Sequence, residues 1–313
     1  MGTAAASRDW GLASVFARKY PLVAKAAPFL LWVLALAAVR QVLVHLLTDG
    51  TWGQDSHAYW LAAQEPLEYG RIPGQKDAYL YSPAFVYAIK PLALLPWPAF
   101  SAVWTLLIAA LAFWLVRPLP VRFAVPVSLI CLSELVVGNI YLMLGAAAVL
   151  AVRAPEAWAF PILTKITTGV GVLRDVARRD WKAVARAVGA TAAIVLVAAA
   201  FRPHAWTDWI SFLLENRDET PDSTASFYLR CAAAIALSLF AARKGWAFLL
   251  APAVMLAAPV FTGPLPLMTL VAVPRLLLLD PPPRSAALDG AAAEGPAAGA
   301  HPEARGPQGT EGS

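Results

Sequence analysis

One carboxylate has surroundings that could support chemistry. Asp55 lies in a polar segment, residues 48–80, that directly follows a long apolar run. Tyr59 and Trp60 come after it at helical spacing, and such aromatic residues are typical of the membrane–water interface. A carboxylate beside these rings can act as a general base that accepts the proton of an alcohol. It can also cap a helix, because Asp is favoured at that position, and the sequence leaves both roles open.

Other ionisable residues lie within apolar runs, where a charge is costly and by default marks a site or a buried pair. For Arg40 and Lys90 the alternative is snorkelling, in which the long side chain carries its charge to the membrane surface. Lys165 has three threonines close by in the sequence and is interpreted as lining a functional cavity. Glu134 is expected to be paired or near a helix end, and His57 is interpreted as a polar residue of the interface.

The composition defines the elements that must position these groups. Of the 313 residues, 59% are apolar and 14% are charged, and the mean hydropathy is +0.60. Soluble domains are about one quarter charged, so a soluble two-domain enzyme is excluded. The apolar residues form long continuous runs rather than the short alternating segments of an outer-membrane barrel. The sequence therefore predicts an all-α, polytopic membrane protein with about eight to ten transmembrane helices.

Ten apolar runs are candidates for these helices. Two of them, 82–96 and 139–152, are the weakest, because the first is broken by prolines and both are short. Either could be a re-entrant or half-buried helix. The candidates are 26–47, 82–96, 99–116, 121–137, 139–152, 156–173, 184–201, 225–242, 246–261 and 264–279.

Charge divides the connecting segments between two sides of a membrane. Residues 1–25 and 174–186 are rich in Lys and Arg, whereas 48–80 and 202–224 are rich in Asp and Glu. The positive-inside rule then predicts a plasma-membrane protein with both termini in the cytoplasm and both acidic loops outside. The net charge of +5 is explained by this orientation in the lipid bilayer, without a nucleic-acid partner.

Three parts follow from these patterns. Residues 1–25 form a cytoplasmic N-terminal segment, and 26–280 form the membrane-embedded domain. Residues 281–313 are rich in Pro, Ala and Gly, which predicts a disordered cytoplasmic tail.

Several kinds of site have no counterpart in the sequence. It contains neither a GxxxxGK[ST] phosphate loop nor a GxGxxG fingerprint, and its four histidines lack metal-binding spacing. Cys131 and Cys231 lie in apolar runs and are interpreted as small hydrophobic residues. We therefore expect no cofactor and no protein-bound metal site, although a requirement for a divalent metal stays open.

The stretch from Asp55 to Trp104 resembles glycosyltransferase family 87, the polyprenyl-phosphate-mannose-dependent α-mannosyltransferases. The family's D-x-x-x-Y-x-x-A loop is matched by Asp55, Tyr59 and Ala62. Further on, the sequence reads Gly70, Tyr79, Tyr81-Ser82-Pro83, where Ser82 replaces a proline, and Pro91-Leu92-Ala93-Leu94-Leu95-Pro96. Weaker matches are Gly138-Asn139-Ile140-Tyr141, Lys165-Ile166-Thr167 and the basic segment around Arg178, Arg179 and Trp181. The chain is shorter than usual members of that family.

The resemblance implies a C-type glycosyltransferase that uses a lipid-phosphate sugar, at an active site on the outer face of the membrane. Asp55 matches the family's proposed base, and would deprotonate a hydroxyl of a glycolipid or glycan acceptor. The hexose, with mannose expected, would be transferred with inversion. A cation should stabilise the departing phosphate, and Tyr59, Trp60 and Tyr81 could stack on sugar or anchor the chain at the interface. The candidate cations are Arg40, Arg71, Lys76, Lys165 and Arg202.

Two alternatives stay open at this level. A transporter or flippase for a lipid-linked or small polar solute would use Lys165 and Glu134 as a central charged pair. A non-catalytic protein of envelope assembly would fit the short C-terminal half. Substitution of Asp55 and of Lys165 distinguishes the first alternative from a transferase.

Overall fold

A computed structural model describes residues 11–64, 67, 69–72, 74–216, 223–261 and 263–279. Within these ranges every regular element is an α-helix or a short 3-10 helix, which confirms the expected all-α membrane protein. The predicted tail, residues 281–313, and the first ten residues lie outside the described part of the chain.

Four of the helices that the structure describes are long and apolar enough to cross a membrane. They are α2 (Pro21–Thr48), α5 (Trp97–Val116), α10 (Trp181–Phe201) and α12 (Thr224–Lys244). A fifth candidate is the pair α6 (Val121–Val137) and α7 (Tyr141–Ala151), with a bend of 117° at the break between them. The number is lower than the eight to ten expected, because the other apolar runs fold as short helices interrupted by prolines and glycines.

The short elements connect and cover the long ones. Those before α7 are α1 (Gly11–Lys19), α3 (Gln54–Gln64) and α4 (Pro83–Ala93). Those after it are η1 (Pro155–Trp158), α8 (Ala159–Thr164), η2 (Ile166–Gly171), α9 (Val172–Ala177), α11 (His204–Glu215), η3 (Ala247–Leu249), α13 (Leu250–Leu256), η4 (Leu265–Ala272) and α14 (Val273–Leu277).

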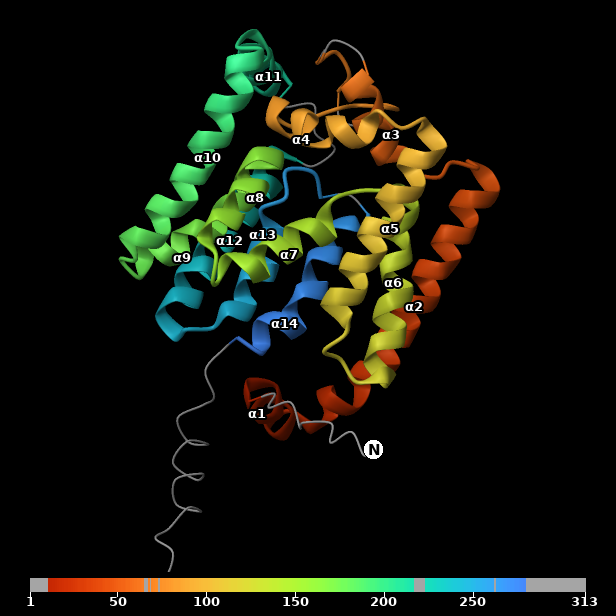
Figure 1. Ribbon diagram of the computed structural model, residues 1–313. Helices are drawn as coiled ribbons and strands as arrows, with labels where there is room; N and C mark the ends of the chain where they lie inside the picture. Colours follow the sequence, from red (N-terminus) through yellow and green to blue (C-terminus); the bar gives the residue numbers. More distant parts are fainter. Residues whose placement is uncertain are drawn as a thin grey trace, which may run out of the picture.

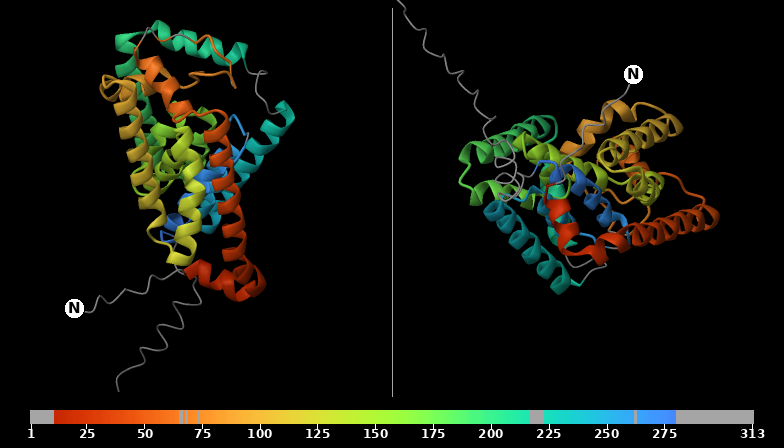
Figure 2. Two further views of the ribbon diagram at one scale, coloured as in Figure 1. Left: turned by 90° about the vertical axis from the view of Figure 1, so that its right-hand side faces the viewer. Right: turned by 90° about the horizontal axis from the view of Figure 1, so that it is seen from below.

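The long helices form two flanks with the short ones between them (Figure 1). Helices α2, α5 and α6 pack together on one flank, and α10 lies on the other. Helices α7, α8 and α13 fill the middle, while α3, α4 and α11 lie across the upper end of the molecule. Helix α1 lies at the opposite end. The left-hand view of Figure 2 shows α11 crossing above the other helices. The segments around α3 and α11, which both belong to acidic loops, therefore share one end.

The interior is made largely from α7 and the elements around it. Ile140, Leu142 and Leu144 are fully buried, and the small residues that follow let η4 and α13 approach closely. By contrast, α2 exposes large apolar side chains such as Leu30, Leu34 and Leu36. A helix that is apolar yet exposed on most faces is typical of one that faces lipid. Cys131 is buried and Cys231 is partly buried, and neither is in a disulfide.

The break between α6 and α7 is held by specific contacts. Gly138 ends α6 with φ +78°, a left-handed conformation that suits glycine. Its carbonyl accepts a hydrogen bond from the indole N–H of Trp104 at 2.9 Å. The backbone N–H of Gly53, just before α3, donates to the carbonyl of Val136 at 2.7 Å. These contacts dock the first turn of α3 onto the break.

Candidate active site

Asp55 lies in the first turn of α3, directly beside the α6–α7 break. The helix begins one residue earlier, at Gln54, so Asp55 is inside the helix rather than at the capping position. The side-chain amide of Asn139 donates a hydrogen bond from Nδ2 to Oδ2 of Asp55. The carboxylate thus lies where a helix N-terminus and an amide donor both favour negative charge.

Burial raises the pKa of Asp55 above that of an ordinary aspartate. The hydrogen bond from Asn139 and the positive charge of Lys165 act in the opposite direction and limit this rise. A carboxylate with a raised pKa is a better proton acceptor once it is ionised, which is what a general base requires.

Lys165 lies at the junction of α8 and η2, where the backbone leaves helical geometry. Its side chain is only 8% exposed. The ammonium Nζ is 3.8 Å from the centre of the Tyr141 ring and 5.6 Å from that of Tyr81. These cation–π contacts stabilise a buried positive charge, which borders the same cavity as Asp55 and interacts electrostatically with its carboxylate.

Glu134 is fully buried and accepts a hydrogen bond at the start of α7. Its Oε1 accepts a hydrogen bond from the backbone N–H of Leu142 at 2.7 Å, so it caps the N-terminus of α7 across the break. Among the residues that the structure describes, no ion pair joins Glu134 to Lys165. The expectation that Glu134 lies near a helix end agrees with this position, whereas the charged pair of the transport hypothesis is not formed.

Tyr59 and Tyr81 are part of the interior and do not face the membrane surface. Tyr59 is 1% exposed, and its hydroxyl is 3.0 Å from the hydroxyl of Tyr81. Their rings belong to an aromatic cluster with Phe85 and Trp104. Burial raises the pKa of Tyr81 to about 12, so that it stays a neutral hydroxyl.

Two cavities meet at these residues. A polar cavity of 340 Å³ is bordered by Asp55, Tyr59 and Asn139. An apolar cavity of 610 Å³ extends between α11 and α12 and is lined by Trp209, Phe212 and Phe227, among others. Both volumes are within the range of ligand sites. The residues that border both cavities are Leu80, Tyr81, Lys165 and Val260.

The other predicted cations lie elsewhere. Arg40, Arg202 and Lys76 are exposed, and Arg71 is exposed with its guanidinium donating to the carbonyl of Asp77 at 3.2 Å. None of the four borders either cavity. Of the predicted site residues, the structure therefore brings together Asp55, Tyr59, Tyr81 and Lys165.

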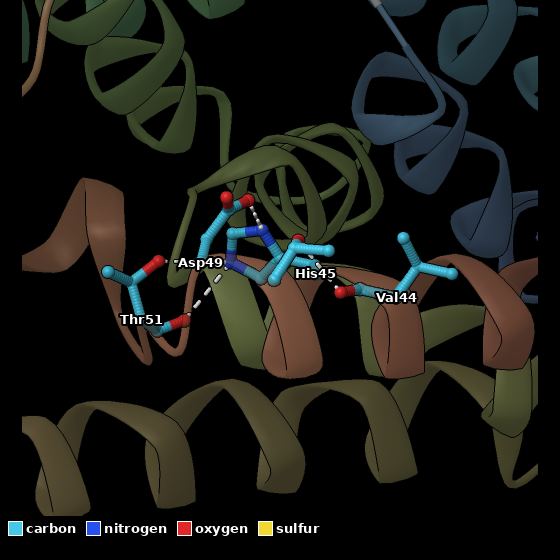
Figure 3. A network of polar contacts seen from close by, with 5 residues as sticks. Val44, His45, Asp49 and Thr51 are labelled. Carbon is cyan, nitrogen blue, oxygen red and sulfur yellow. Dashed lines mark hydrogen bonds and ion pairs between the residues drawn. The ribbon is translucent and has the colours of Figure 1, made fainter.

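Two histidines support the backbone near Asp55. His57 lies 2.7 Å from Asp77, measured from Nδ1 to Oδ1, and so ties the acidic loop to α3. At the end of α2, the ring of His45 lies between the carboxylate of Asp49 and the backbone of Thr51, with both contacts at 3.0 Å (Figure 3). His45 also borders the polar cavity. The turn that leads from α2 into α3 is thus held by side-chain hydrogen bonds.

Sequence reasoning did not assign roles to Asn139, Tyr141 and the aromatic wall of the apolar cavity. Asn139 had a signal, because it falls in a loosely matched motif beside a glycine. Tyr141 belongs to the same motif, whereas Phe227 had no signal, since an aromatic residue in an apolar run is ordinarily part of the core. Within the described residues, no group of three or more His, Cys, Asp and Glu side chains converges as a metal centre would require.

The fold and site define a polytopic helical membrane protein in which a partly buried carboxylate and a buried ammonium border one cavity. The sequence model of glycosyltransferase family 87 matches residues 79–292, more than half of the chain. The protein belongs to this family and is a glycosyltransferase. No curated protein and no solved structure matches the chain. The match includes Tyr81, Asn139 and Lys165 but begins after Asp55, whose role stays a prediction.

Proposed function

We propose that this glycosyltransferase moves a hexose, most simply mannose, from a polyprenyl-phosphate donor to a hydroxyl of a glycolipid or glycan acceptor. The observation that carries the proposal is the junction of a polar and an apolar cavity at Tyr81 and Lys165. A lipid-linked sugar has the same division into a polyhydroxyl head, a phosphate and an apolar chain. The head suits the cavity with Asp55, and the chain suits the cavity with Trp209 and Phe227.

The chemistry assigned to each group follows from its position. Asp55 accepts the proton of the acceptor hydroxyl while the hydroxyl oxygen forms a bond to the anomeric carbon. The bond from that carbon to the phosphate oxygen breaks on the opposite side, so a β-linked donor gives an α-linked product. Negative charge grows on the leaving phosphate, and the ammonium of Lys165 stabilises it in a site largely closed to water. Tyr59 and Tyr81 offer neutral hydroxyls to the sugar.

The proposed setting is the plasma membrane, with the cavities toward the outer face and both termini in the cytoplasm. The acidic segments around α3 and α11 share one end of the molecule, and α1, with Arg18 and Lys19 in its last turn, lies at the other. The positive-inside rule supports placing the end with α1 in the cytoplasm. A lipid-linked donor in the outer leaflet then reaches the apolar cavity from the bilayer.

The test is sugar transfer in membranes that contain the protein, from labelled polyprenyl-phosphate mannose into lipid and polymer fractions. Wild type is compared with Asp55→Asn and with Asp208→Asn, a control that removes an exposed carboxylate of α11. We expect transfer by the wild type and the control, and a loss of about a hundredfold or more in Asp55→Asn. Equal transfer by all three proteins would remove Asp55 from the mechanism, and no transfer by any would remove the donor.

A further inference from the structure

We propose that Asn139 is the positioning residue of the base: its amide holds one oxygen of the Asp55 carboxylate and leaves the other for the acceptor hydroxyl. This rests on the proposed function, in which Asp55 is the base. Asn139 borders the polar cavity together with Asp55, and the two side chains come from segments that are far apart in the sequence.

The orientation of the Asn139 amide is fixed by a second hydrogen bond. Its Oδ1 accepts from the backbone N–H of Ile140 at 2.7 Å. An N–H can only donate, so the oxygen of the amide must face Ile140 and the NH₂ group must face Asp55. If the amide were flipped, its NH₂ group would face the N–H of Ile140 and its oxygen would face the carboxylate of Asp55. Neither contact would be a hydrogen bond. Asn139 is therefore set to donate to Oδ2 of Asp55 before any substrate binds.

The backbone that carries Asn139 is itself restrained. Gly138 before it is held by Trp104, and Glu134 caps the helix that starts two residues after it. An amide on such a restrained backbone loses little conformational freedom when it binds the carboxylate, so the hydrogen bond is pre-organised.

Helix α3 is held against the α6–α7 break by close contact. A Cβ on Gly138 would lie 2.5 Å from Oγ and 2.8 Å from Cβ of Ser56, so only glycine allows the approach. A Cβ on Gly53 would lie 2.7 Å from Oγ of Ser56, and the backbone N–H of Gly53 donates to the carbonyl of Val136 at the α6–α7 break. The distance between Asp55 and Asn139 is thus set by backbone contact on both sides of the pair.

The hydrogen bond also favours the ionised carboxylate. It lowers the pKa of Asp55, in opposition to burial, and the positive charge of Lys165 acts in the same direction. Removing the amide should therefore make the base harder to ionise. The remaining titratable groups that border this cavity are Tyr59 of α3, Tyr81 before α4, Tyr141 of α7, His45 of α2 and Asp77 of the loop. Glu134 of α6 does not border the cavity but interacts electrostatically with Asp55.

The experiment compares the wild type with Asn139→Leu, Asn139→Asp and the control Gln64→Leu. Gln64 belongs to the same helix as Asp55 and donates its amide to the carbonyl of Ala93, away from both cavities. Transfer of labelled mannose from polyprenyl-phosphate mannose to octyl α-mannoside is measured in lipid nanodiscs across a range of pH. In parallel, dicyclohexylcarbodiimide, which reacts with protonated carboxyls, labels Asp55, and the labelled peptide is quantified by mass spectrometry at each pH.

For Asn139→Leu we expect kcat to fall about tenfold or more with little change in the donor KM, because a charge-assisted hydrogen bond is lost. The acid limb of the rate profile and the midpoint of carbodiimide labelling should both move to higher pH. Asn139→Asp should move both further, since a second carboxylate opposes ionisation of the first. Gln64→Leu should leave both unchanged.

Other outcomes separate the two proposals. A labelling midpoint that does not move in either Asn139 variant would overturn the positioning role, even if activity falls. A raised donor KM with unchanged kcat would overturn it as well, because Asn139 would then bind the sugar directly. Undiminished transfer by Asp55→Asn would overturn the assignment of Asp55 as the base. The labelling midpoints of the Asn139 variants would still report whether Asn139 stabilises the ionised carboxylate. Loss of folded protein is checked by size-exclusion chromatography of each variant.

Discussion

Replacement of Gly138 by alanine tests the close contact that places Asp55. Such a substitution has two effects, the conformational cost of a positive φ and the clash of the added Cβ. A comparison of three glycines of this chain separates them. Gly189, within α10, has an ordinary helical φ and nothing within 4 Å of an added Cβ. Gly245, which ends α12, has φ +72° and equally open space, whereas Gly138 has φ +78° and Ser56 in the way.

The magnitudes follow from these geometries. Gly189→Ala should stabilise the fold by about 0.5–1 kcal/mol, since alanine is the better helix former. Gly245→Ala should destabilise it by about 1–2 kcal/mol, the cost of a left-handed conformation with a Cβ. Gly138→Ala has the same conformational cost, and overpacking against Ser56 adds about 1–3 kcal/mol. The backbone N of Ser56 lies 3.3 Å from the added Cβ, so a rotation of the serine side chain cannot fully relieve the clash.

The assay is thermal unfolding of the three detergent-solubilised variants beside the wild type, with sugar transfer measured below the transition. The melting temperatures should fall in the order Gly189→Ala, wild type, Gly245→Ala, Gly138→Ala, and transfer should fall only in the last. Adding Ser56→Gly to Gly138→Ala removes the nearest contacting atoms and should recover part of the stability. Equal destabilisation by Gly138→Ala and Gly245→Ala would refute the close contact between α3 and the α6–α7 break.

Further predictions concern the two charges and the lipid cavity. Lys165→Met should lower kcat in the transfer assay by about a hundredfold or more, because the leaving phosphate loses its cation. The control Lys182→Met, at an exposed position of α10, should leave kcat unchanged. Burial raises the pKa of Asp55, and the base acts when it is ionised. Activity should therefore be lost as the pH falls through a value above about 3.9, the pKa of an exposed aspartate. An acid limb of the rate profile at or below that pH would contradict this. Phe227→Ala should raise the KM of a long-chain donor more than that of a donor with a farnesyl chain, as kinetics with the two lipids would reveal. Equal effects on both lipids would place the chain elsewhere.

The long helices could be predicted from the sequence because their signal is local. The runs that become α2, α5, α10 and α12 are apolar over a whole crossing and lack internal breaks, apart from Pro28 near the start of α2. The run 156–173 is also rich in apolar residues but folds as two 3-10 turns around a short helix. Hydropathy measures which residues avoid water and not whether they face lipid or other protein segments, so it overcounted the crossings.

Individual site residues show the same limit. Asp55 could be singled out because a carboxylate among interfacial aromatic residues is unusual, and Lys165 because threonines accompany it. The cap that Glu134 forms on α7 could not be predicted, because it depends on the 117° bend that brings Leu142 back toward α6. The burial of Tyr59 also depends on tertiary contacts, here with Phe85 and Trp104. Residues whose role depends on a neighbour distant in the chain leave no local signal.

The position of the site groups has a common cause, which makes such sites easier to find in related chains. Asp55 follows the turn at Gly53, Asn139 follows Gly138, and Lys165 separates α8 from η2. Each lies within two residues of an interruption between helical segments, where backbone polar groups need new partners. In a membrane protein such breaks are tolerated where they are buried in protein or line a cavity. A break therefore requires a cavity or polar neighbours, and the same polar neighbours can hold a base, a cation or a sugar. Glycines and polar residues that interrupt apolar runs are for this reason better indicators of the site than charge alone, since Arg71 and Arg202 are charged but lie exposed.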